Sequence, residues 1–388
     1  MTNWRRHLDT ALTNHFSTYK EVLVLLGARQ VGKTTFLRKI FPAAQYLSVD
    51  TEPIREVLNR YDPVVYRQIL KSNQPIVVID EIHKLADPGR AAKIFYDQIS
   101  EYKLIITGSS AFNIKNTASE SLAGRKIEYH LYPLTFSEYL VQNGVMDDFR
   151  NLFLDKFKDS KTYSFDLPAV LDNILIYGLY PAMVSHPADQ NYLTNLIDSV
   201  VFRDLLDLQL IENRPGALNL LKLLAFQVGS LVNYADLSNR LGMTVKTVGR
   251  YIDLFEQSFI IFKLLPYAKS GRDEIGKMPK IFFYDVGLRN ALIENFQPIS
   301  SRPDGGQLFE NFIISEVLKT NYYYGDFGYH LNYWRTKQGS EIDLVLSKAN
   351  GELRGVEIKL AGRTGGKAFL NRYPQGKIIT VNKSNFYQ

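Results

Sequence analysis

The chain has 388 residues, of which 45% are hydrophobic and 22% are charged, so we expect about two or three globular domains with sizeable cores. It contains no cysteine, which excludes disulfide bridges and cysteine-ligated zinc. The net charge of +6 is small beside 46 basic residues and favours an acidic partner such as DNA only weakly. Because no signal-peptide pattern and no apolar run of spanning length is present, we expect a soluble, cytoplasmic protein that does not bind membranes.

The first strongly patterned segment is a short apolar strand, residues 21–26, which runs into GARQVGKTT. This contains the complete P-loop pattern in its required place between a strand and a helix. Glycine lets backbone N–H groups approach phosphates, and the helix that follows points the positive end of its dipole at them. The pattern predicts ATP and Mg²⁺ as ligands, with Lys33 on the β- and γ-phosphates and Thr34 on the metal. The predicted nucleotide-binding residues are Gly27, Ala28, Arg29, Gln30, Val31, Gly32, Lys33, Thr34 and Thr35.

A second apolar strand, residues 76–79, ends in the adjacent acids Asp80 and Glu81. An acidic side chain at the carboxyl end of a buried parallel strand lies beside the phosphate-binding crevice. We therefore expect Asp80 to hold Mg²⁺ and Glu81 to polarise the attacking water. The adjacent acids also argue against a small-molecule kinase, in which the second acid is usually missing.

Three further polar residues are candidates for the nucleotide site, each with a plainer alternative. Ser109 ends a third strand and is predicted to sense the γ-phosphate, although a helix cap explains it equally well. Arg125 follows a turn of small residues and could act as an arginine finger on a neighbouring subunit, or be an ordinary surface arginine. Arg203 could be a second nucleotide-sensing arginine or the partner of a nearby aspartate.

Strands expected near residues 45–50 and 127–134 alternate with helices, which indicates an α/β fold with a parallel sheet covered on both faces. The motif order GARQVGKTT, VVIDEIHKL, ITGSSAF, ESLAGRK, LYPLTFSEYL closely resembles prokaryotic P-loop ATPases of the AAA superfamily, which typically carry a C-terminal restriction-endonuclease-like domain of unknown function. The resemblance covers essentially the whole chain. We predict a P-loop ATPase domain (residues 1–140), a helical linker or lid (141–214), a winged-helix-like domain (215–290) and an α/β restriction-endonuclease-like domain (291–388).

The third of these domains is predicted from a helix-turn-helix signature. Asn233 can cap a first short helix, Gly242 ends it, and Thr244 caps the second. The two strands that follow bracket a polar loop that would form a wing. In DNA-binding proteins the second helix enters the major groove, where it would present Lys246, Thr247 and Arg250. Packing against the nucleotide domain without DNA contact is an equally good interpretation.

Near the C-terminus, two strands flank the hairpin turn Asn350-Gly351. A three-residue loop places Asp343 opposite Glu357, and Lys359 shares the face of Glu357 because strand side chains alternate. A two-residue loop would mix apolar and polar faces, so the apolar pattern excludes it. Carboxylates in this arrangement suit Mg²⁺ or Mn²⁺, and Glu310 could add a ligand from the preceding helix.

These residues resemble the PD-(D/E)xK nuclease core, in which Asp343, Glu357 and Lys359 would be catalytic. Ile342 stands where a proline often precedes the aspartate. We therefore expect an ATPase whose nucleotide state controls a nuclease-like, DNA-associated module. The alternative is a regulatory ATPase scaffold with an inactive C-terminal domain that binds a protein partner, for which the aromatic run at residues 321–334 offers a surface. A homo-oligomer fits either interpretation.

Overall fold

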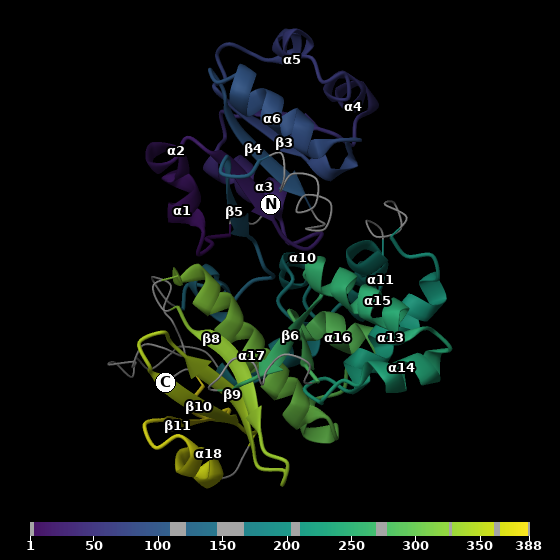
Figure 1. Ribbon diagram of the computed structural model, residues 1–388, viewed down its shortest axis with the longest axis vertical. Helices are drawn as coiled ribbons and strands as arrows, with labels where there is room; N and C mark the ends of the chain where they lie inside the picture. Colours follow the sequence, from purple (N-terminus) through teal and green to yellow (C-terminus); the bar gives the residue numbers. More distant parts are fainter. Residues whose placement is uncertain are drawn as a thin grey trace. The chain divides into compact units, whose positions relative to one another are not determined.

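The computed structural model describes residues 4–108, 122–145, 167–202, 210–268, 278–325, 328–360 and 365–386. Contacts within the chain divide it into two compact units, whose elements are labelled in Figure 1. Unit 1 comprises residues 1–133, 199–210 and 257–259, and unit 2 comprises residues 134–198, 211–256 and 260–388. The finer division into four domains stays a prediction.

Unit 1 is built on a five-stranded sheet in the order β2-β3-β4-β1-β5. All neighbouring strands are parallel, as the alternation of strands and helices predicts. The interior strand β1 is buried along its whole length, which is typical of a parallel sheet with both faces covered. The strands are β1 (Val22–Leu26), β2 (Gln45–Ser48), β3 (Ile76–Asp80), β4 (Lys103–Gly108) and β5 (Lys126–His130).

The helices of unit 1 start at recognisable signals. Proline stands in the first turn of α4, α5 and α6, where its missing N–H costs no helical hydrogen bond. Asp62 and Asp87 cap α5 and α6 by accepting backbone N–H groups. The helices are α1 (Asp9–Thr13), α2 (His15–Thr18), α3 (Lys33–Ile40), α4 (Glu52–Leu58), α5 (Pro63–Ile69), the 3₁₀ turn η1 (Ile82–Lys84) and α6 (Pro88–Gln98).

Unit 2 contains the helix-turn-helix elements expected from the sequence. Asn233 accepts the N–H groups of the first turn of α14, and Gly242 ends that helix in the left-handed conformation. The Thr244 hydroxyl accepts from the Thr247 N–H at the start of α15. Its helices are α8 (Phe136–Gln142), α9 (Leu167–Tyr177), α10 (Pro181–Ser185), α11 (Gln190–Ile197), α13 (Arg214–Phe226), α14 (Tyr234–Leu241), α15 (Val245–Gln257) and α16 (Val286–Leu292), and η2 (Asp198–Phe202) is a π-helical turn at the boundary with unit 1.

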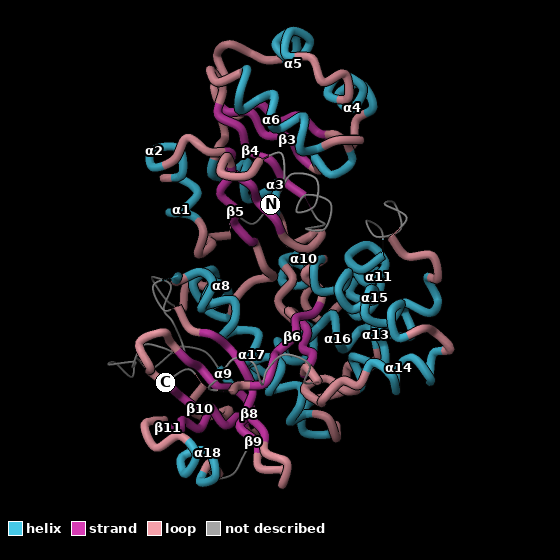
Figure 2. The backbone as a smooth tube through the Cα atoms, viewed as in Figure 1, coloured by secondary structure: helices cyan, strands magenta, loops and turns pink. Residues whose placement is uncertain are grey.

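A six-stranded mixed sheet, in the order β11-β10-β9-β8-β6-β7, forms the rest of unit 2. Strands β8 to β11 lie side by side in Figure 2. The antiparallel pair β6–β7 brackets the loop predicted as a wing, and that loop falls mostly outside the described residues. The elements are β6 (Ile261–Pro266), β7 (Lys280–Phe283), η3 (Ile299–Ser301), α17 (Gly305–Tyr323), β8 (His330–Arg335), β9 (Glu341–Ser347), β10 (Leu353–Ile358), α18 (Lys367–Arg372) and β11 (Lys377–Val381).

The C-terminal strands carry their own apolar core. Side chains of β8, β9, β10 and α18 pack together on one face of the sheet. This cluster consists of Trp334, Ile342, Val345, Leu353, Phe369 and Tyr373. The α/β architecture with a mixed sheet is as expected, whereas a restriction-endonuclease fold stays a prediction. No helix in the described ranges is both long and apolar enough to cross a bilayer.

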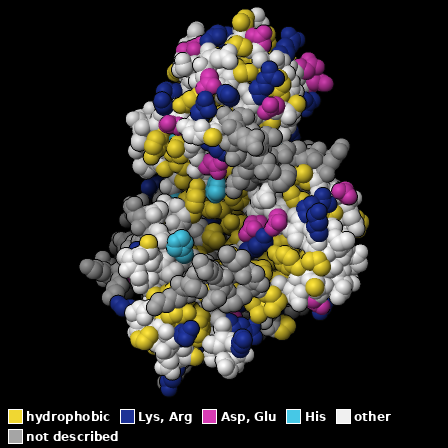
Figure 3. Space-filling model, in the orientation of Figure 1, with side chains coloured by type: hydrophobic (Ala, Val, Ile, Leu, Met, Phe, Trp, Pro, Cys, Tyr) yellow, Lys and Arg dark blue, Asp and Glu magenta, His cyan; other side chains and the backbone are white. Residues whose placement is uncertain are grey.

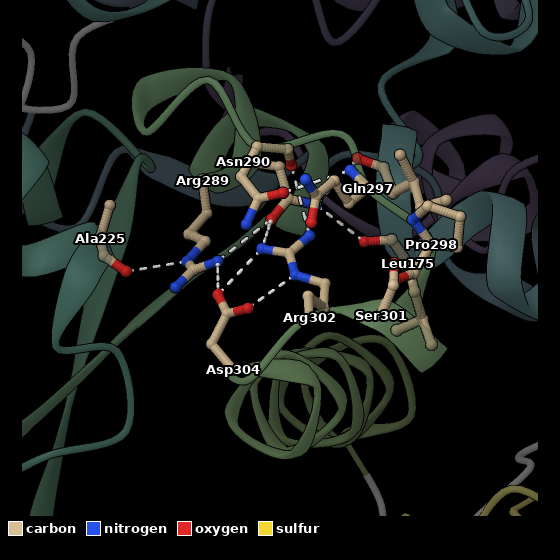
Figure 4. Close-up of polar contacts among 11 residues, drawn as sticks. Leu175, Ala225, Arg289, Asn290, Gln297, Pro298, Ser301, Arg302 and Asp304 are labelled. Carbon is tan, nitrogen blue, oxygen red and sulfur yellow. Dashed lines mark hydrogen bonds and ion pairs between the residues drawn. The ribbon is translucent and has the colours of Figure 1, made fainter.

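A buried polar network fastens the helices of unit 2 together (Figure 4). The guanidinium groups of Arg289 and Arg302 share the carboxylate of Asp304, at 2.5 Å and 2.7 Å. Arg289 also donates to the Ala225 carbonyl, and Asn290 donates to carbonyls at the end of α9. Burial alone would raise the pKa of Asp304, but the two arginines outweigh it and lower the pKa to about 2. The network links α9, α13 and α16 to the start of α17.

A second buried polar group fixes the segment that begins unit 2. The Lys319 ammonium lies 2.5 Å from the Glu316 carboxylate, and both side chains are only 2% exposed. Lys319 donates to the Leu134 carbonyl at 3.1 Å, and Glu316 accepts the Phe136 N–H at 2.7 Å. The first residues of unit 2 are therefore held on α17 by hydrogen bonds to an ion pair.

Candidate functional site

The P-loop lies between β1 and α3, at the carboxyl end of β1. A Cβ atom at Gly27 would come within 2.2 Å of the Leu131 carbonyl oxygen, so a glycine is required there. Gln30 and Gly32 have positive φ angles of 62° and 90°, which turn the loop into the helix. The buried Lys33 ammonium donates to the Gly27 and Ala28 carbonyls at 2.9 Å and 3.0 Å. The lysine is thereby held along the inner side of the loop.

Side-chain hydrogen bonds of Arg6 and Gln30 connect this loop to other segments of unit 1. The buried Arg6 guanidinium donates to the Val31 carbonyl of the loop at 3.4 Å and to the Tyr132 carbonyl at 2.6 Å. Gln30 donates to the Ser199 hydroxyl at 2.8 Å. Arg6 therefore connects the P-loop to the segment that follows β5, which the sequence alone did not indicate.

Asp80, at the carboxyl end of β3, meets the P-loop directly. The Thr34 hydroxyl donates to one Asp80 carboxylate oxygen at 2.8 Å, and the Thr107 hydroxyl donates to the other. The two predicted Mg²⁺ ligands, Thr34 and Asp80, are therefore neighbours. A hydroxyl and a carboxylate side by side are oxygen ligands of the kind that Mg²⁺ prefers.

Glu81 has a left-handed backbone conformation with φ of 57°, which is uncommon for a residue other than glycine. Its N–H donates to the Thr107 hydroxyl at 3.2 Å, and its carboxylate lies 3.4 Å from the ring of the buried His83. Such strained residues cluster at functional sites, where the surrounding contacts hold them in place.

Thr107 is the site residue that sequence reasoning missed. It is fully buried on β4, the strand that lies between β1 and β3 in the sheet, and it touches both acids through one hydroxyl. Thr107 stands two residues before Ser109 and lies within the strand, so it was not among the residues predicted for the ATP site. The sign that the sequence offered was a threonine near the carboxyl end of a mostly apolar strand.

Of the other arginines and serines predicted for the ATP site, Arg125 does not join this group. Arg125 lies just before β5, at the amino ends of the strands, whereas Lys33 and Asp80 lie beyond the carboxyl ends of β1 and β3. Its guanidinium contacts Asp97 at 3.1 Å and lies over the Tyr96 ring. Ser109 and Arg203 fall outside the described residues.

The C-terminal hairpin has the register that the apolar pattern predicts. The Lys348 N–H donates to the Glu352 carbonyl across a three-residue loop. Leu344 pairs with Val356, so the next position in the same register places Asp343 opposite Glu357. The Ile358 N–H donates to the Asp343 carboxylate at 2.7 Å.

The predicted metal ligands of this region do not form a metal site. In the described part of the chain, no group of three or more His, Cys, Asp or Glu side chains is arranged to hold a metal ion. Glu310 is bound instead by the Lys280 ammonium at 3.1 Å, and Glu357 by the Lys359 ammonium at 2.8 Å. Burial raises the pKa of Glu310 to about 7, although Lys280 opposes the shift. Burial likewise raises the pKa of Asp343. The described residues therefore give no support to the expected ligand set of Glu310, Asp343 and Glu357, two of whose acids contact lysines.

Of the residues predicted to face DNA, Lys246 and Arg250 are exposed on α15 and Thr247 is partly exposed. Arg250 on α15 contacts the exposed Glu212 carboxylate at 3.4 Å. On the face drawn in Figure 3, Lys and Arg side chains lie in separate groups, several of them beside Asp or Glu side chains. DNA binding by α15 stays a prediction.

Three models of protein families match parts of this chain. Residues 19–140 match the model of an AAA domain (AAA_14). The match covers the P-loop and all five strands of the parallel sheet. Residues 169–298 and 305–383 match two domains of unknown function, DUF8612 and DUF4143.

Relatives of this chain are similar over most of its length. The uncharacterized protein MJ1637 of Methanocaldococcus jannaschii is 26% identical over 355 residues, which cover 84% of this chain and 73% of that protein. An uncharacterized protein of Haemophilus influenzae is 24% identical over 352 residues, covering 85% and 80%. Among solved structures, the Walker-type ATPase PABY2304 of Pyrococcus abyssi aligns with a TM-score of 0.48 and 14% identity, covering 76% of this chain and 96% of that one.

Proposed function

We propose that this chain is a Mg²⁺-dependent ATPase whose nucleotide state controls its C-terminal half. The observation that carries the proposal is the hydrogen bond from Thr34 to Asp80 at 2.8 Å, beside the P-loop that holds Lys33. A hydroxyl from the loop and an acid from the end of another strand of the sheet are the two protein ligands that P-loop ATPases use for Mg²⁺. Mg²⁺ bound there would neutralise charge on the β- and γ-phosphates.

Each of the chain's own residues then has a defined task. Lys33 extends along the loop and would neutralise the γ-phosphate oxygens. Glu81 would accept a hydrogen bond from the attacking water and orient it. Thr107 would keep the two acids in place, since its hydroxyl bonds to both Asp80 and the Glu81 backbone. Rigid placement of the reacting groups supplies much of the rate enhancement in phosphoryl transfer.

Arg125 fits this scheme only as a residue supplied to another subunit. It lies at the amino ends of the strands, opposite to the nucleotide site of its own sheet. An arginine finger in trans would therefore require a homo-oligomer. Loss of turnover in Arg125→Ala, restored by mixing with a Lys33→Ala variant, would support that arrangement.

The test of the central proposal is ATP turnover by wild type, Lys33→Ala and Glu81→Gln, each with and without DNA. Lys33→Ala should abolish turnover, and Glu81→Gln should bind ATP but hydrolyse it very slowly. Lys93→Ala, which changes an exposed lysine on α6, is the matched control and should behave as wild type. If Lys33→Ala hydrolyses ATP at the wild-type rate, the proposal is wrong.

A second candidate concerns the C-terminal half. We infer a binding module without nuclease activity, favoured by the lysines that neutralise Glu310 and Glu357. Cleavage of DNA or RNA with Mg²⁺ or Mn²⁺, lost in Asp343→Ala while ATP turnover persists, would instead establish the nuclease-like module expected from the sequence. The slope of DNA affinity against salt then separates a DNA partner from a protein partner, because phosphate contacts release counterions.

A further inference from the structure

Lys280 is the most confined cation of the C-terminal sheet. It is the first residue of β7, its backbone is paired with Leu264 of β6, and it forms an isolated bridge to Leu231. Only 3% of its side chain is exposed. Its ammonium lies over the Tyr333 ring, 5.7 Å from the ring centre, so the ring covers one side of it. The position of the ammonium is therefore set by strand pairing and packing.

Carboxylates from two other elements converge on this ammonium. Glu310 of α17 lies at 3.1 Å and Glu341 of β9 at 2.5 Å. Burial by itself would lower the pKa of Lys280, but the charges of Glu310, Glu341 and Asp343 outweigh it and raise the pKa. The side chains of Glu310 and Glu341 are 15% and 26% exposed, so water screens these charges only partly.

Two acids, Glu310 on a helix and Glu341 on a strand, contact one buried ammonium, so a charge of +1 already occupies the point between them. A second cation beside it would lie within a few ångströms of the ammonium and would be repelled. Removing the ammonium would instead leave Glu310 partly desolvated without its ion pair, and Glu341 with only the Arg335 guanidinium at 3.4 Å, which is unfavourable unless another cation enters.

We propose that the Lys280 ammonium is the built-in cation of the Glu310 and Glu341 carboxylates, so that wild-type protein excludes Mg²⁺ and Mn²⁺ there and removal of the ammonium opens a site for one divalent cation. The inference rests on the contacts within unit 2 and extends the proposal of a C-terminal half without metal-dependent cleavage. The inference does not depend on ATP hydrolysis. A failure of the ATPase proposal can therefore be distinguished from a failure of this inference.

The experiment titrates Mn²⁺ into the full-length protein without nucleotide and follows free Mn²⁺ by electron paramagnetic resonance. The parent protein and every variant also carry Asp80→Asn, which removes the carboxylate beside the P-loop as a competing Mn²⁺ ligand. Lys280→Met should bind one Mn²⁺ about tenfold or more tightly than the Lys280 protein, since a buried opposing charge is removed. Lys280→Arg, which keeps a cation, should bind none. Adding Glu341→Gln to Lys280→Met should weaken the acquired binding.

Lys263→Met is the matched control, because Lys263 also contacts two carboxylates, those of Asp253 and Glu256, but on a more exposed surface. It should acquire no comparable Mn²⁺ binding. Lys280→Gln, whose amide keeps donors for the carboxylates, serves if Lys280→Met does not fold. Mn²⁺ should also raise the melting temperature of the Lys280 variant and not of the parent.

Two results would overturn the inference. One is Mn²⁺ binding by the Lys280 protein that Glu341→Gln removes, which would show a metal site coexisting with the ammonium. The other is a folded Lys280→Met or Lys280→Gln protein, judged by circular dichroism and a cooperative thermal transition, that binds no more Mn²⁺ than its parent.

Discussion

Replacement of Thr107 by valine tests the geometry that joins the two acids of the ATP site. Valine has nearly the same shape as threonine, so the substitution removes the hydroxyl and leaves the packing of β4 in place. Two hydrogen bonds are lost: the one donated to the Asp80 carboxylate and the one accepted from the Glu81 N–H at 3.2 Å. Since Thr107 is fully buried, water cannot replace the lost hydroxyl without a local shift.

The magnitude follows from these two contacts. A hydrogen bond to a charged group contributes about 1.5–3 kcal/mol, and an N–H left without an acceptor costs about 1–3 kcal/mol. We expect Thr107→Val to lower the free energy of unfolding of unit 1 by about 2–4 kcal/mol, because the two effects overlap in part. Displacement of Glu81 by a fraction of an ångström to 1 Å should lower kcat for ATP by about 10- to 100-fold.

The assay combines urea denaturation with steady-state ATP hydrolysis at varied Mg²⁺. The reasoning predicts a fall in kcat that is larger than any rise in KM, because Thr107 orients catalytic groups and does not belong to the P-loop. Thr107→Ser is the control, since it restores the hydroxyl and should recover most of the activity. Wild-type turnover by Thr107→Val, or equal loss in Thr107→Ser, would refute the assigned role.

Three other substitutions test separate contacts. Gly27→Ala should abolish ATP turnover and destabilise unit 1, because its Cβ would lie 2.2 Å from the Leu131 carbonyl oxygen, as measured by ATP hydrolysis and thermal melting. Lys319→Met should cost about 3–5 kcal/mol in denaturant unfolding by leaving Glu316 buried and unpaired, whereas Lys319→Met with Glu316→Gln should cost less. The lowered pKa of Asp304, about 2, means that its carboxylate stabilises the fold above pH 4, and this contribution of about 2 kcal/mol is lost as pH falls toward 2. Asp304→Asn should lack that part of the pH dependence.

Each of these has a control or a contrary outcome. Gly306→Ala adds a Cβ on α17 where no atom lies within 4 Å, and it should be tolerated. A double variant of Lys319 and Glu316 as unstable as Lys319→Met alone would contradict the account of the buried pair. Equal loss of stability between pH 4 and pH 2 in wild type and Asp304→Asn would show that another group dominates that range.

The local sequence was enough to predict those structural features that depend on residues close together in the chain. The P-loop follows from a strand, a glycine turn and a helix start that are contiguous from residue 21 to residue 40. The register of the C-terminal hairpin also followed from sequence, because a slip of one residue would move every apolar side chain to the wrong face. Asn233 and Gly242 likewise marked the ends of α14.

Tertiary structure alone decided which distant side chains meet. The sheet order inserts β4 between β1 and β3, and that insertion places Thr107 between the two acids, a relation that strand sequence does not reveal. It also sets Arg125 at the opposite end of the sheet from Lys33. In the C-terminal half, the sequence suggested a metal bound by acids that include Glu310, whereas the packing of α17 beside β7 brings the ammonium of Lys280 against Glu310. Periodicity specifies which face a side chain occupies, but the charge that it meets there depends on which elements pack together.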